Sequence, residues 1–93
     1  VDMGVGYELG PVLSTRETDL RGARAEGALF DVERLLDKAM RDGLSSVRII
    51  HGRGTGALRQ AIRDLLDGHP LVKSFAPEEP ERGGDGATIV YLI

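Results

Sequence analysis

Residues 47–56 read VRIIHGRGTG, a short run rich in β-branched side chains that passes directly into a glycine-rich turn. β-Branched residues favour a buried strand, and closely spaced glycines permit a tight turn whose backbone can approach a ligand. Residues 57–67 then carry apolar side chains at helical spacing, which predicts a helix. Strand, turn and helix in immediate succession indicate an α/β fold. The apolar positions of this predicted helix are Leu58, Ile62, Leu65 and Leu66.

The segment before this unit predicts another strand and another helix. Residues 15–21 alternate between the two sides of a half-buried strand. Residues 23–42 place apolar side chains at helical spacing, and Gly43 follows where a left-handed C-terminal cap belongs. Residues 1–14 are rich in glycine and have no sustained period, so we expect a linker or the tail of a preceding domain. The first residue is Val rather than Met, which favours a domain excised from a longer protein.

The last third of the chain completes a sheet. Residues 71–75 predict a third strand, and residues 77–86, which are acidic and glycine-rich, predict a mobile loop. Residues 87–93 are apolar on both faces, as expected of a central strand. The predicted order is β-α-β-α-β-β, and right-handed crossovers place both helices on one face of the sheet. We therefore predict a two-layer α/β sandwich with a four-stranded mixed sheet and one open face.

Composition limits the possible functions. The chain has 93 residues and no Cys, so it forms one domain without disulfides, thiolate zinc sites or a cysteine nucleophile. The absence of Cys fits a reducing cytosol, and we expect a cytoplasmic protein. Aromatic residues make up only 4%, which argues against a platform of stacked rings for single strands. No apolar run approaches the ~20 residues that cross a bilayer, so we expect no membrane partner.

Charge is distributed unevenly along the sequence. The net charge is −3, but residues 46–75 contain five basic and two acidic side chains, which leaves −6 for the rest. A basic face on an acidic body attracts phosphate weakly and in a salt-sensitive way.

Three polar side chains follow the two predicted parallel strands, where ligands gather in open α/β sheets. They are Asp19, Arg21 and His51. If the strands are neighbours, their ends lie ~5 Å apart, and the three groups would converge on one edge. His51 exchanges a proton near neutral pH, and Arg21 can fork onto phosphate oxygens. Asp19 can orient a water, hold a metal or fix the imidazole tautomer, so this set predicts phosphodiester cleavage.

Two plainer interpretations stay open. One is that Asp19 and Arg21 form a surface ion pair without a function. The other is that His51 is only a turn residue. Strict alternation from Val47 and Ile49 also points His51 toward the helices, away from Asp19. His69 before Pro70 is most simply a residue that ends a helix. Three further acids are expected in a solvated loop, namely Glu78, Glu79 and Glu81.

The glycine-rich turn predicts a phosphate cradle, because free amides and a helix dipole favour an anion. A flexible turn is the alternative. No Lys-Ser/Thr pair follows the last glycine, which excludes a Walker loop. Arg59 and Arg63 lie one helical turn apart and would extend a basic stripe, unless they belong to a solvated face. The predicted nucleic-acid-binding residues are Gly52, Arg53, Gly54, Thr55, Gly56, Arg59 and Arg63.

Metal ligands are not identified by the sequence. A lone Asp and a lone His make a weak site by themselves, so Mg²⁺ or Mn²⁺ would have to bind together with substrate phosphates. No other cofactor is expected in this domain.

Four motifs stand in order along residues 15–93: TDLRG (18–22), HGRGTG (51–56) with Leu58-Arg59, HPLVKSF (69–75) and GGDGATIVYL (83–92). Together they resemble the small MutS-related (Smr) domain family. One departure is Thr18, where the family usually has Leu, which we interpret as a packing change.

The resemblance implies a fold like the C-terminal domain of translation initiation factor three, and a place at the C-terminus of the second bacterial MutS paralogue. It implies a nicking endonuclease that acts on branched or duplex DNA without sequence preference and suppresses homologous recombination. ATP would bind elsewhere in the parent protein, which we expect to be a homodimer, whereas the isolated domain would be a monomer. RNA cleavage in ribosome rescue, or a non-catalytic module that docks on nucleic acid or the ribosome, are the alternatives.

Overall fold

The structure, a computed structural model, describes residues 15–93. The predicted linker over residues 1–14 lies outside the described residues. Each predicted strand and helix is present, with ends shifted by two residues at most. In chain order, the elements are β1 (Thr15–Asp19), α1 (Ala25–Arg41), β2 (Ser46–Ile50), α2 (Ala57–Leu66), β3 (Val72–Pro77) and β4 (Ala87–Leu92).

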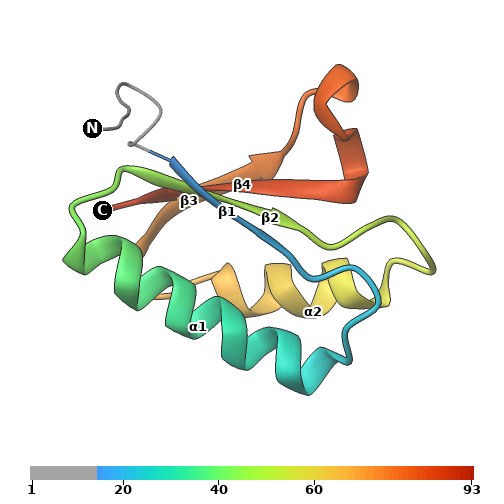
Figure 1. Cartoon of the computed structure of the whole chain (residues 1–93), viewed down its shortest axis with the longest axis horizontal. Coiled ribbons are helices and arrows are strands. Elements are labelled where there is room, and N and C mark those ends of the chain that lie inside the picture. Colours follow the sequence, from blue (N-terminus) through green and yellow to red (C-terminus); the bar gives the residue numbers. More distant parts are fainter. Residues whose placement is uncertain (1–14) are drawn as a thin grey trace, which may run out of the picture.

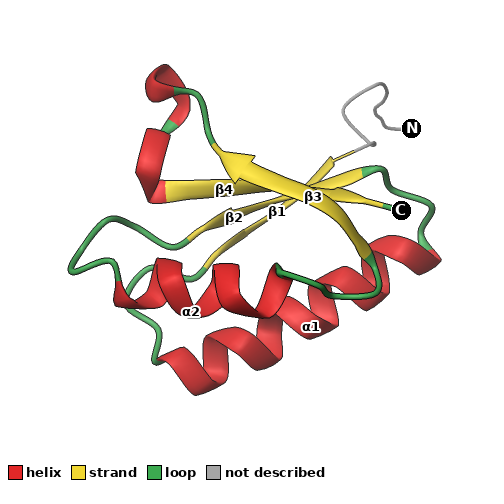
Figure 2. Ribbon diagram, turned by 180° about the vertical axis from the view of Figure 1, so that it is seen from behind, coloured by secondary structure: helices red, strands yellow, loops and turns green. Residues whose placement is uncertain are grey.

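The four strands form one mixed sheet in the order β1-β2-β4-β3. β1 and β2 are parallel, whereas β4 is antiparallel to both β2 and β3. Both helices cover one face of this sheet, and the opposite face is open (Figures 1 and 2). The predicted two-layer sandwich, with the last strand in a central position, is therefore confirmed.

The core lies between the sheet and the two helices. Val47 and Ile49 of β2 point into it, and both are fully buried. They pack with side chains from both helices, and each buried aliphatic side chain contributes on the order of 2 kcal/mol. The strict alternation of β2 matters for the site, because it decides which face receives the residue that follows the strand. The other large core residues are Val32, Leu36, Ile62, Leu66 and Val90.

His69 lies in the connection between α2 and β3 and ties that connection to α1. Its Nε2 lies 2.7 Å from Oε1 of Glu33, and its Nδ1 accepts a hydrogen bond from the backbone N–H of Leu71 at 3.1 Å. The second bond leaves the ring proton on Nε2, which donates it to Glu33. The residue predicted only to stop a helix therefore also joins two elements.

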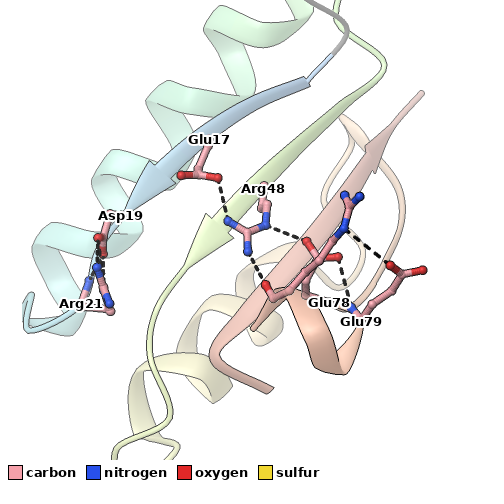
Figure 3. A network of polar contacts seen from close by, with 7 residues as sticks. Glu17, Asp19, Arg21, Arg48, Glu78 and Glu79 are labelled. Carbon is pink, nitrogen blue, oxygen red and sulfur yellow. Dashed lines mark hydrogen bonds and ion pairs between the residues drawn. The ribbon is translucent and has the colours of Figure 1, made fainter. Parts of the chain in front are cut away.

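Residues 78–86 make up most of the predicted loop, and most of their side chains are exposed, but hydrogen bonds to the sheet order the segment. They fold into two short 3₁₀ turns, η2 (Pro80–Arg82) and η3 (Gly84–Gly86), which rise from one end of the sheet (Figure 1). Arg48 on the open face holds this segment: Nε donates to Glu78 at 2.6 Å, and the guanidinium also donates to the carbonyl of Arg82 (Figure 3). Its Nη1 bonds Glu17 of β1 at 2.6 Å.

The prediction of a solvated carboxylate is wrong for Glu78, whose side chain is only 7% exposed. Burial alone would raise the pKa of Glu78, but the hydrogen bond from Arg48 and the positive charges around it lower that pKa overall. Composition could not reveal this, because the partner lies 30 residues earlier on another strand. Glu79 and Glu81 are exposed, as predicted.

Candidate functional site

Asp19 and Arg21 form a tight pair at the carboxyl end of β1, on the open face of the sheet (Figure 3). Arg21 Nη2 lies 2.6 Å from Oδ2 of Asp19, and Arg21 Nε and the Arg21 backbone N–H each donate to Oδ1 at 3.0 Å. The side-chain hydrogen bond from Arg21, helped by the backbone bond, lowers the pKa of Asp19 to about 2. Asp19 is therefore an ionised carboxylate at neutral pH and a poor proton acceptor.

His51 follows β2 and continues its alternation, so its ring turns toward the helices and is only 4% exposed. Nδ1 lies 2.8 Å from the carbonyl oxygen of Gly52, and Nε2 lies 2.8 Å from the hydroxyl of Thr88. A carbonyl oxygen only accepts, so the neutral ring carries its proton on Nδ1 and Nε2 accepts from Thr88.

Burial is the main cause that lowers the pKa of His51. The positive charges of Arg63 and Arg59 act in the same direction, whereas the Gly52 carbonyl and Asp85 oppose the shift. The imidazole is therefore neutral at neutral pH, the state in which one ring nitrogen, here Nε2, has a lone pair that accepts a hydrogen bond.

The expected convergence of the three polar groups is only partly correct. β1 and β2 are parallel neighbours, and Asp19 stands beside Ile50 on the open face. His51 lies on the other face, because β2 keeps its alternation to the end, and Asp19 does not fix its tautomer. Arg21 stays next to the turn: its Cγ lies 3.3 Å from the point that a Cβ on Gly52 would occupy. The structure therefore joins Asp19 to Arg21 and Arg21 to the turn, but not Asp19 to His51.

The glycine-rich turn borders a pocket of about 330 Å³. Residues 51–58 form one wall, and residues from the connection to α1 form the other, so the N-termini of both helices face the same space. Gly56 adopts φ +87° at the start of α2, a conformation that favours glycine. Neither N-cap residue makes a side-chain cap bond, but the hydroxyl of Thr55 accepts a hydrogen bond from the N–H of Ala57 at 3.3 Å. The residues on this second wall are Gly22 and Ala23 of the connection and Ala25, the first residue of α1.

Backbone amides in this turn are available to a ligand. Within residues 15–93, no acceptor engages the N–H groups of Arg53, Gly54 and Thr55. The amides before them are occupied, since the N–H groups of His51 and Gly52 both donate to the carbonyl of Gly86, at 3.0 and 2.9 Å. Free amides at a helix start carry partial positive charge and favour an anion. The geometry therefore supports the predicted phosphate cradle.

The three arginines of the predicted basic surface differ in position. Arg53 is exposed, and Arg59 is half-buried with Nη1 4.0 Å from a carboxylate oxygen of Asp85. Arg63 does not extend an exposed stripe. Its Nε and Nη2 are buried and have no hydrogen-bond partner among the described residues. Two buried donor groups without an acceptor cost free energy.

Two contributors to the site were missed by the sequence interpretation. The start of α1 has no motif of its own, because the residues that line the pocket there are small and carry no polar side chain. Thr88 did leave a signal, since it is a hydroxyl at a core-facing position of an otherwise apolar strand and such a group needs a partner. Among residues 15–93 there is no group of three or more His, Cys, Asp or Glu side chains that could hold a metal ion. No helix in the same part of the chain is long and apolar enough to span a membrane.

The family model and the known proteins that match this chain agree with one another. The Smr domain family model matches residues 18–93. Endonuclease MutS2 of Thermomicrobium roseum is 54% identical over 76 residues, 82% of this chain and 10% of that protein. Endonuclease MutS2 of Thermus thermophilus is 48% identical over 82 residues, 88% of this chain and 11% of that protein. The chain thus spans about a tenth of the length of these relatives.

Solved structures of related proteins have a similar fold. The crystal structure of the Smr domain of Thermus thermophilus MutS2 superposes with a TM-score of 0.82 at 49% identity, and the match covers 84% of this chain and 98% of that one. YdaL, a stand-alone small MutS-related protein from Escherichia coli, gives 0.70 at 28% identity, over 82% of this chain and 63% of that one. The family model covers nearly all of the described residues, so the chain belongs to the Smr domain family.

Proposed function

We propose that this domain binds the phosphodiester backbone of DNA in the pocket beside residues 51–58 and nicks it. The observation that carries the proposal is the meeting of two helix N-termini and three free amides in one pocket, with an arginine at its border. Backbone amides and arginines recognise phosphate and carry no sequence information, so cleavage would be sequence-nonspecific. The name "Endonuclease MutS2" of the relatives supports this reaction class.

Arg21 is the group that we assign to the scissile phosphate. The aliphatic part of its side chain lies beside Gly52, and its guanidinium makes a forked contact with the Asp19 carboxylate. A phosphate competes for the same fork, because Arg binds both anions in the same planar geometry. Displacement would release Asp19 to orient the attacking water or to hold Mg²⁺ or Mn²⁺ together with substrate phosphates.

His51 is the group that we assign to proton transfer. Among the described residues of the pocket it is the one side chain whose ordinary pKa lies near neutrality, and its lowered pKa leaves it a neutral base. Both of its ring nitrogens are bonded inside the protein, so transfer requires one of them to exchange its partner for water or substrate. Hydrogen bonds of catalytic groups often reach their productive geometry only in the complex with substrate.

The satisfied nitrogens also favour a second candidate, a non-catalytic module that docks on nucleic acid. His51 would then only shape the turn. His51→Asn separates the two candidates, because the Asn side-chain amide can still donate to the Gly52 carbonyl but cannot titrate near neutral pH.

The test measures relaxation of supercoiled plasmid and binding to a short DNA duplex, for the wild type and this variant. Proton transfer by His51 predicts a rate loss of ~10²–10⁴-fold with binding retained. A variant that nicks at the wild-type rate would refute the catalytic role, and a wild type that binds but does not nick would favour the docking module.

RNA of the same length, and ribosomes, are the competing ligands, and we propose DNA ahead of both. The proposed setting is a longer, dimeric, ATP-binding MutS2-like protein that suppresses homologous recombination.

A further inference from the structure

A continuous chain of hydrogen bonds runs from the core of the sheet to the glycine-rich turn. The hydroxyl of Thr88 on β4 lies 2.8 Å from Nε2 of His51, and Nδ1 of the same ring lies 2.8 Å from the carbonyl of Gly52. Thr88 is fully buried, so its hydroxyl makes this contact in a dry environment. Hydrogen bonds in such surroundings are strong, and an unsatisfied group there is costly.

The direction of each bond follows from the groups at the two ends. The Gly52 carbonyl accepts only, so Nδ1 must donate. A neutral ring then presents a lone pair at Nε2, and Thr88 satisfies it by donating its hydroxyl proton. If Nε2 carried the proton instead, the Nδ1 lone pair would face the Gly52 oxygen, and the two would repel each other.

The orientation of the Gly52 carbonyl determines where the next amide points. The peptide bond between Gly52 and Arg53 is trans, so the Arg53 N–H points opposite to the carbonyl that His51 holds. That N–H has no acceptor among the described residues and belongs to the turn that borders the pocket. Fixing the carbonyl against the ring therefore leaves this amide free for an anion.

We propose that Thr88 is a positioning residue: through the tautomer of His51 it fixes the peptide between Gly52 and Arg53 in the orientation that offers the Arg53 amide to a phosphate. The inference rests on the proposed function in one respect, that phosphate is the ligand of the turn. Thr88 itself does not act as a nucleophile, because its hydroxyl is buried behind the imidazole and faces no ligand space. The ligand class is a phosphodiester, held by the backbone and not by Thr88.

The experiment combines ring ¹⁵N NMR with binding to a short DNA duplex, for the wild type, Thr88→Ser and Thr88→Val. We expect the wild-type ring of His51 to carry its proton on Nδ1. Thr88→Ser keeps the hydroxyl and is expected to preserve both the tautomer and the affinity. Thr88→Val removes the donor, so we expect signals from both tautomers and DNA binding weaker by about tenfold or more, as for the loss of a hydrogen bond to a charged group.

The matched control is Thr18→Val, the same change at a half-buried threonine on β1, which should leave tautomer and affinity unchanged. A wild-type ring protonated on Nε2 would overturn the proposal, and that measurement needs no variant to fold. Wild-type affinity and a single Nδ1 tautomer in Thr88→Val would overturn it as well. If the wild type fails to bind DNA at all, the proposed function fails, whereas the tautomer result still decides how Thr88 positions the ring.

Discussion

Asp19 and Arg21 are joined by a 2.6 Å contact between Oδ2 and Nη2, on the face of the sheet opposite to the ring of His51. The carboxylate therefore has a basic partner of its own and is not the group that orients the imidazole. Catalysis by this domain, as proposed, has to bring the two faces together through the phosphate.

The pairing of Asp19 predicts an acid-dependent loss of stability. Its pKa is lowered from 3.8 to about 2, so the contribution of this pair is present above pH 3.8 and is lost as the pH falls toward 2. Asp19→Asn lacks the charge and should lack this dependence. Melting temperatures measured across that range should therefore converge for the two proteins at the acid end. A constant difference between them would contradict the assignment.

Burial of His51 predicts that the stability of the fold also depends on pH in a higher range than for Asp19. Its folded-state pKa lies below 6.5, so the unfolded chain takes up the proton first as the pH falls. The stability that comes from the neutral, buried ring is thus present above pH 6.5 and decreases as the pH drops through the folded-state pKa. Urea unfolding between ~pH 7.5 and ~pH 5 should show this decrease in the wild type and a smaller one in His51→Asn. His69→Gln is the control for the other histidine, and equal slopes in wild type and His51→Asn would refute the prediction.

Arg53→Glu should strongly weaken binding to DNA and RNA alike, because phosphate contacts carry no sequence information. Arg53 is an exposed residue of the turn, and reversing its charge repels the nucleic-acid backbone there. The wild-type salt dependence should correspond to only ~2–4 phosphates at ~0.9 each, since the domain has few basic contacts. Arg41→Glu, near the opposite end of α1, tests whether any charge reversal has the same effect. Unchanged affinity in Arg53→Glu would remove the turn from the binding site.

Arg48→Ala should destabilise the fold by about 1–3 kcal/mol, because it leaves the Glu78 carboxylate buried without its partner. The matched control is Arg16→Ala, which breaks the more exposed pair with Asp42 and should cost under ~1 kcal/mol. Urea denaturation gives both values. Equal losses for the two variants would mean that Arg48 contributes no more than a surface ion pair.

Sequence periodicity was sufficient to predict the order of the strands and helices and the layers that they form. Alternation in β2 predicted both its buried face and the side to which His51 turns, and the apolar run at the C-terminus predicted a central strand. These features depend on neighbours a few residues apart. Spacing alone could not identify the partners of a side chain: Thr88 lies 37 residues from His51, and Glu78 lies 30 residues from Arg48. Arg63 was misplaced for the same reason, because helical spacing gives a face but not how deeply a long side chain enters the protein.

The double hydrogen bond from the turn to Gly86, and the contact of His51 with Thr88, have a consequence for the order in which the protein forms. Every residue assigned to phosphate or proton transfer has already been synthesised by Arg63, yet the atoms that hold their turn come from Gly86 and from Thr88 of β4. Contacts between such distant residues form late, since the intervening chain must close first. A chain truncated before β4 would therefore contain all the assigned residues but would lack the contacts that shape the site.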